Sequence, residues 1–137
     1  MKFSVNQQDL QKSLNYCQGV IEKRSTLPIL SNVLLEVSNA NLTITATDLD
    51  LIFIHKIPNV EISEEGKTTS SSSIMYDIVR KFSSGSKINF SNPSENKLHL
   101  ESDKSIFNLN CINASEFPLT DENFNENEFS IKSKELL

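Results

Sequence analysis

The stretch Arg24-Ser25-Thr26-Leu27-Pro28-Ile29-Leu30-Ser31-Asn32 separates a helical pattern from a run of strand patterns. Pro28 biases the residue before it away from the helical conformation, so this stretch is expected to be a non-helical connection. Before it, apolar side chains recur at helical spacing, and after it they alternate along the chain. A helix that leads directly into several strands is typical of an α+β domain.

Residues 2–5 alternate and predict a short strand, which is followed by an amphipathic helix. Its apolar stripe consists of Leu10, Leu14, Cys17 and Ile21. Its polar face carries Gln8, Lys12 and Asn15. Asn6 is the expected N-cap, and Gly19 can end the helix.

Alternating patterns after Asn32 predict a series of strands, at 32–37, 42–47, 49–57, 60–62 and 68–70. A second amphipathic helix is predicted around Ile74, Ile78 and Phe82, with Met75 and Val79 beside them. Tyr76 and Arg80 fall on its polar face, and Gly85 follows it. Three more strands are expected at 87–90, 97–100 and 105–110, separated by turn-rich loops at 92–96 and 102–104. Short turns imply antiparallel pairing, so we predict an α+β domain with two helices packed on antiparallel sheets.

The end of the sequence repeats its beginning. Phe129-Ser130-Ile131-Lys132-Ser133-Lys134-Glu135-Leu136 has the pattern of Phe3-Ser4-Val5-Asn6-Gln7-Gln8-Asp9-Leu10: aromatic, Ser, β-branched, three polar residues, acid, Leu. An acidic stretch precedes the repeat. We therefore expect a first domain at 1–120, a linker at 121–127 and the truncated start of a second domain at 128–137, as in a tandem array.

The composition, 37% hydrophobic and 23% charged, is that of a globular protein. We expect no secretory signal, because residues 1–5 have no long apolar core and no small-residue cleavage site. No apolar run approaches the roughly 18 to 20 residues of a membrane span, so a cytoplasmic location is expected. The net charge of −5 argues against a conventional tight DNA binder, but it allows a few basic residues gathered on one face. Cys17 and Cys111 leave a disulfide open, although two reduced, buried thiols fit a cytosolic protein better.

The sequence favours a protein that is not an enzyme. It has no G-x-S-x-G, P-loop or paired-cysteine motif. His55 and His99 fall inside strand patterns without clustered Cys or His, so neither a metal nor a cofactor is predicted. Asp48 and Asp50 form a carboxylate pair, but their place beside Leu49 in a turn indicates a structural role. A hydrolase of unrecognised type is therefore the weakest alternative.

Several motifs resemble those of one family, the beta subunit of bacterial DNA polymerase III, the sliding clamp. Residues 24–32 are similar to the family's R-x-T-L-P-I-L-x-N segment, and Thr47-Asp48-Leu49-Asp50 to its T-D-L-[DE] turn. Ala114-Ser115-Glu116-Phe117-Pro118 resembles its A-x-[DE]-[FY]-P exit. The opening Met1-Lys2-Phe3 also matches, so the resemblance extends over essentially all of residues 1–137.

The resemblance implies a DNA-clamp-like fold and a role as the processivity factor of bacterial DNA replication. In that family, three similar domains form a subunit, and two subunits close head to tail into a homodimer ring around duplex DNA. Helices line the hole, and the full-length protein binds DNA polymerase III and the clamp loader. The alternative is a free-standing α+β protein-interaction module that does not encircle DNA. The repeat at Phe129 favours the clamp, because neither that module nor a hydrolase predicts a second copy.

The resemblance also implies a set of DNA-facing residues. Arg24 falls in the matched motif and is expected to contact DNA, with Lys23 beside it. Lys12 and Arg80 should face the hole if the apolar stripes of the helices face the sheets. Because topology holds the DNA, such contacts are expected to be few, weak, directed at phosphate and sensitive to salt. The second helix departs from the family, since Ser73 and Ile74 stand where relatives often carry basic residues.

Ring closure requires an edge strand that joins the sheet of a partner subunit. The match assigns this role to residues 105–109, with Phe107, Leu109 and the helix residue Ile78 as apolar contacts. The alternative is that all three are ordinary core residues. An edge strand without its partner is open to non-native pairing.

Overall fold

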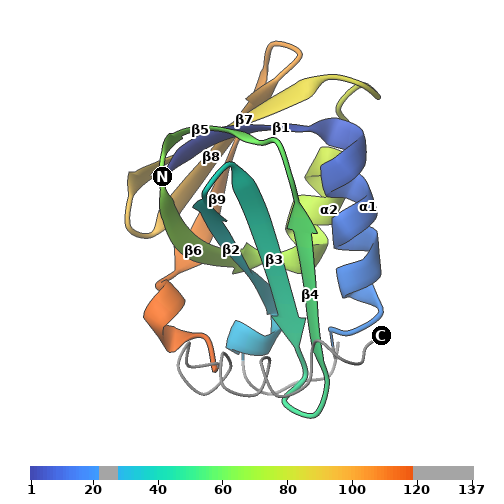
Figure 1. Ribbon diagram of the computed structural model, residues 1–137, viewed down its shortest axis with the longest axis vertical. Coiled ribbons are helices and arrows are strands. Elements are labelled where there is room, and N and C mark those ends of the chain that lie inside the picture. Colours follow the sequence, from blue (N-terminus) through green and yellow to red (C-terminus); the bar gives the residue numbers. More distant parts are fainter. Residues whose placement is uncertain (22–27, 119–137) are drawn as a thin grey trace.

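The computed structural model describes residues 1–21 and 28–118, and Figure 1 shows two helices lying side by side against antiparallel sheet. The helices are α1 (Gln7–Gln18) and α2 (Ser72–Val79). The strands are β1 (Lys2–Asn6), β2 (Asn32–Ser38), β3 (Asn41–Thr47), β4 (Ile52–Ile57), β5 (Glu61–Glu64), β6 (Gly66–Ser71), β7 (Lys87–Ser94), β8 (Lys97–Ser102) and β9 (Ser105–Ile112). Short 3-10 turns occur at Pro28–Ser31 and Ala114–Glu116.

Every strand pair is antiparallel, and the strand order is β4-β3-β2-β6-β9-β8-β7-β1-β5. The two halves of the domain are β1-α1-β2-β3-β4-β5 and β6-α2-β7-β8-β9, and the first strand of each half pairs with a strand of the other half. Thus β1 pairs with β7 and β6 pairs with β2. The predicted α+β class with antiparallel sheets is confirmed, but the exchange of first strands was not predicted.

The core lies between the helices and the sheets. The α1 side chains in this core are Leu10, Leu14 and Cys17, and all three are fully buried, as the helical spacing predicted. Asn6 caps the helix, because its side-chain oxygen accepts hydrogen bonds from the backbone N–H of Gln8 at 2.9 Å and of Asp9 at 3.4 Å. These bonds satisfy donors that a helix otherwise leaves without partners.

The predicted start of β4 at Leu49 is wrong, because a turn occupies residues 48–51 and the strand begins at Ile52. The Asp48 carboxylate accepts from the backbone N–H of Asp50 at 3.0 Å and of Leu51 at 2.7 Å. Leu49 has a φ of 83°. Hydrogen bonds from a side chain to nearby backbone N–H groups stabilise a turn in place of the backbone hydrogen bonds between strands. The structural role predicted for Asp48 is confirmed.

The predicted stripe of α2 needs a correction. Ile74 is 51% exposed, and the buried positions are Met75, Ile78, Val79 and Phe82. The helix begins at Ser72, capped by the Ser71 hydroxyl, which accepts from the N–H of Ile74 at 3.3 Å. Its inward face therefore follows the i, i+3, i+4, i+7 spacing from Met75, and Ile74 points to solvent.

β7 also differs from its prediction, since it runs to Ser94 and takes in part of the expected loop at 92–96. Its pairing with β8 is irregular between Ser91 and Ser94. An irregularity of this kind allows a strand to extend into turn-forming sequence.

Cys17 and Cys111 are both free and buried, so the expectation of two thiols is confirmed and the disulfide is not present. Burial raises the pKa of the Cys17 thiol to about 12, and burial also raises the pKa of Cys111. In the part of the chain that is described, no helix is long and apolar enough to cross a bilayer.

Candidate nucleic-acid interface and sheet edge

The outward faces of α1 and α2 form a shallow polar groove of about 290 Å³. It is lined by the buried Gln7 and by Gln8, Gln11, Lys12, Asn15, Tyr76 and Ser84. None of these residues carries a carboxylate, although the whole chain has a net charge of −5. The groove is therefore neutral to basic, while acidic residues lie elsewhere on the domain.

Side-chain hydrogen bonds fix the geometry of this groove. The buried Gln7 amide donates to the Gln11 Oε1 at 2.8 Å and to the Val79 carbonyl at 2.9 Å. The Tyr76 hydroxyl donates to the Asn15 Oδ1 at 3.2 Å. Because Val79 and Tyr76 belong to α2, these bonds hold the two helices in a defined position relative to each other.

Lys12 lies on the exposed face of α1, as the sequence predicted, and no ion pair is recorded for it within residues 1–21 and 28–118. Its ammonium group is available to an external anion. Lys12 also helps to line the groove.

Arg80 follows the last residue of α2, and its side chain is 53% exposed. Its guanidinium lies 5.2 Å from the centre of the Tyr76 ring and 3.6 Å from the Asp77 carboxylate. An exposed pair of this kind contributes little to stability. Asp77 nevertheless offsets part of the charge that Arg80 would offer to a phosphate. Lys23 and Arg24, the other two predicted DNA contacts, lie outside the described residues.

Strand β9 presents an open edge. Residues 105–110 pair with β8 on one side. On the other side, β9 pairs with β6 only through Cys111 and Ile112. The Asn110 carbonyl also accepts from the Ser70 hydroxyl of β6 at 3.0 Å. Along residues 105–109, the described part of the chain therefore has backbone groups on this side that pair with no other strand.

The predicted interface residues occupy different environments along this edge. Phe107 is half-buried and its ring meets Phe82 edge to face at 5.6 Å. Leu109 and Ile78 are each only 8% exposed and belong to the core of the domain. Ile106, which the sequence analysis did not single out, is 56% exposed on the same strand. Only the alternation of the predicted strand at 105–110 could have indicated from the sequence that Ile106 is exposed.

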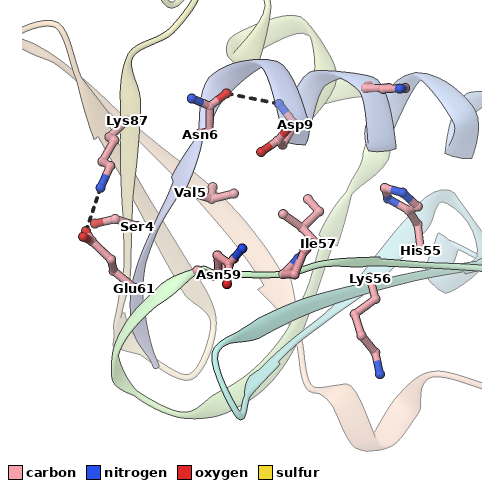
Figure 2. A pocket seen from close by; sticks show the side chains of 13 residues that line it. Ser4, Val5, Asn6, Asp9, His55, Lys56, Ile57, Asn59, Glu61 and Lys87 are labelled. Carbon is pink, nitrogen blue, oxygen red and sulfur yellow. Dashed lines mark hydrogen bonds and ion pairs between the residues drawn. The ribbon is translucent and has the colours of Figure 1, made fainter.

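A larger hollow, of about 420 Å³, lies where β1, the start of α1 and the β4–β5 connection meet (Figure 2). Glu61 and Lys87 form an ion pair of 3.0 Å at its rim, and Lys56 points away from it. His55 contacts the hydroxyl of Ser13, but Ser13 is fully buried, so no substrate could reach that oxygen. The Ser13–His55 pair is therefore a partly buried contact between α1 and β4.

Comparison with known families identifies the domain. Residues 1–121 match the model of the family described as DNA polymerase III beta subunit, N-terminal domain. The chain belongs to this family. The predicted resemblance is thereby confirmed.

Curated relatives and solved structures of the beta-subunit family agree with this assignment. The chain is 32% identical to the beta sliding clamp of Caulobacter vibrioides strain NA1000 / CB15N, over 100% of this chain and 37% of the relative. It is 35% identical to that of Escherichia coli K12, over 96% of this chain and 36% of the relative. A solved DNA polymerase III subunit beta from Bartonella birtlesii, bound to griselimycin, superposes with a TM-score of 0.83 at 36% identity, over 88% of this chain and 32% of that one. The chain thus spans about a third of the length of these relatives.

Proposed function

We propose that this chain is the first domain of a bacterial processivity clamp, a ring that encircles duplex DNA and tethers the replicative polymerase. The observation that carries the proposal is the match of residues 1–121 to the beta-subunit N-terminal domain. The acid-free groove between α1 and α2 supports it, because a polar helix surface suits the wall of a hole that contains DNA. The role is non-catalytic.

A clamp must retain DNA and still slide along it. Retention comes from the closed ring, so each contact with DNA needs only to be weak and independent of base sequence. Lys12 and Arg80, together with Lys23 and Arg24, supply contacts of this kind to phosphates. A chain whose overall charge is −5 but whose helix groove lacks acids fits this requirement, since a strongly basic lining would slow sliding.

Ring closure uses the open edge of β9. A partner subunit adds a strand along residues 105–109, head to tail, and Phe107 meets it from a half-buried position. Leu109 and Ile78 support this edge from the core, and Ile106 adds an exposed apolar side chain. Main-chain bonds give affinity in such pairing, and side chains give specificity.

The other partners bind the remainder of the ring. DNA polymerase III and the clamp loader bind the full-length protein through parts that residues 1–137 do not include. Residues 128–137 begin a second domain after a linker at 121–127. The site of action is the cytoplasm, where the bacterial chromosome is replicated.

The test uses the natural protein that contains this chain, loaded by a clamp loader onto nicked circular DNA. The protein should stay on the circle during gel filtration and should leave when a restriction enzyme makes the DNA linear. A duplicate in which both ends of the linear DNA are blocked by bound protein is the control, and it should restore retention. Retention on unblocked linear DNA would show binding by affinity and would refute the ring.

A further inference from the structure

Three amide side chains form a row along the side of α1 that faces α2: Gln11, Asn15 and Gln18. They are spaced at i, i+4 and i+7, which gives a row about 10 Å long at 1.5 Å per residue. All three are at least partly accessible to solvent. Gln11 and Asn15 line the polar groove, and Gln18 lines a neighbouring hollow together with Ser73.

In all three amides, the carbonyl oxygen is already occupied. Gln11 accepts from the Gln7 amide at 2.8 Å, Asn15 from the Tyr76 hydroxyl at 3.2 Å, and Gln18 from the Ser72 hydroxyl at 3.0 Å. Within the described residues, no partner is recorded for any of the three NH₂ groups. An amide offers two N–H donors and an oxygen with two lone pairs, so a side chain whose oxygen already accepts one bond still presents both of its donors to a ligand.

We infer that this row is a phosphate-binding track for duplex DNA, in which neutral NH₂ donors contact the phosphodiester oxygens. A phosphodiester oxygen only accepts hydrogen bonds, and Asn and Gln side chains are regular donors to it. Lys12, one position beyond Gln11, brings a single positive charge to the same groove. The absence of carboxylates among the groove residues removes the groups that would repel the phosphates.

The chemistry of the track suits sliding. A lysine that binds a phosphate releases a counterion and makes binding strongly dependent on salt, whereas a neutral donor adds a hydrogen bond without that term. A row of equivalent donors along one helix can exchange one phosphate for the next with little change in energy. The track therefore explains how the domain contacts DNA although its second helix carries Ser73 and Ile74 where basic residues were expected.

This inference rests on the proposed function, and one titration separates the two. Short duplex DNA is added at low salt to the ¹⁵N-labelled 137-residue chain, and NMR follows the backbone amides and the side-chain NH₂ groups. The NH₂ signals of Gln11, Asn15 and Gln18 should shift together with the backbone signals around Lys12. Backbone shifts at Lys12 without any NH₂ shifts would refute the track and leave the DNA role intact. No shift anywhere would also refute the track, whereas the ring itself is tested by retention on circular DNA.

A matched pair of variants gives a second readout. Asn15→Asp keeps the oxygen that accepts from Tyr76 but replaces the donor by a carboxylate oxygen. Asn96→Asp makes the same charge change in the exposed β7–β8 turn, where the Asn96 oxygen accepts from the Ser94 hydroxyl at 3.0 Å. Asn15→Asp should weaken DNA binding about fivefold more than Asn96→Asp does, which is the effect of about one hydrogen bond. Equal losses would mean that only net charge matters and would contradict the track.

Discussion

Cys17 shows how strongly one position on α1 is set by its surroundings. Its side chain has no exposed surface, and burial raises its pKa to about 12. An ionised thiol would have to lose its hydration to remain in this core, so the folded domain keeps the proton. The residue is therefore a core side chain and not a reactive thiol.

The free energy of unfolding should fall as the pH rises above about 8.5, where unfolded thiols ionise. The folded thiol stays protonated up to about pH 12, so the stabilisation is complete below the unfolded pKa and is lost as pH rises through the folded pKa. Cys17 contributes a slope of about 1.4 kcal/mol per pH unit in this window. Urea unfolding of the parent and of Cys17→Ala at neutral pH and about pH 10 measures it. A difference between the two proteins that does not change with pH would contradict the assignment.

The environment of a residue could be predicted from the sequence where a single physical rule decides it. The burial of Leu10 and Leu14 follows from helical spacing, and the cap at Asn6 follows from its position before the helix. The exposure of Ile74 was missed because apolar character alone does not fix where a short helix begins. The donor row was missed for a different reason. Glutamine and asparagine can both donate and accept, and only the partners of Gln11, Asn15 and Gln18 decide which group faces outward.

At the scale of elements, α1 depends on its N-terminal cap. Asn6→Ala removes the oxygen that accepts from the N–H groups of Gln8 and Asp9, and it should lower the free energy of unfolding by about 1 kcal/mol. Asn6→Asp keeps an accepting oxygen and places a negative charge at the positive end of the helix, so it should remain close to the parent. Urea titrations followed by circular dichroism compare the three proteins. A loss in the Asp variant as large as that in the Ala variant would show that the cap is not the cause.

The open edge of β9 gives a second prediction for an element. In the natural protein, Ile106→Lys places a charge on a strand that must accept a partner, and lysine on an edge strand opposes pairing. The dissociation constant of the dimer should rise about tenfold or more. Sedimentation velocity measures the change, with Ile74→Lys as the matched control because Ile74 is 51% exposed on α2 and Ile106 is 56% exposed on β9. Equal effects of the two substitutions would exclude β9 as the closing edge.

Element boundaries were less predictable than element types. Apolar periodicity predicts both helices and the succession of helices and strands along the chain. However, β4 begins three residues later than expected, because the Asp48 carboxylate organises a turn. β7 extends beyond its expected end through an irregular pairing with β8. In each case a local hydrogen-bond arrangement decided the boundary, and periodicity carries no information about such bonds.

At the scale of the whole molecule, the class of fold was predictable but the pairing of strands was not. Short turns correctly indicated antiparallel neighbours such as β2 with β3 and β7 with β8. The pairs β1–β7 and β2–β6 join segments from different halves, and no turn in the sequence connects them. The family motifs compensated for this gap, since they identified the fold without any knowledge of its pairing.

The exchange of first strands also has a consequence for synthesis. Within this domain β1 is synthesised before the other strands, yet both of its neighbours, β5 and β7, are made much later, and Lys2 lies opposite Ser91. At the usual rates of translation, β1 therefore waits on the order of ten seconds for its second neighbour. During that time a nascent chain exposes Phe3 and Val5, which the finished domain buries. Chaperones that hold nascent chains should protect the β1 segment until β7 has been translated.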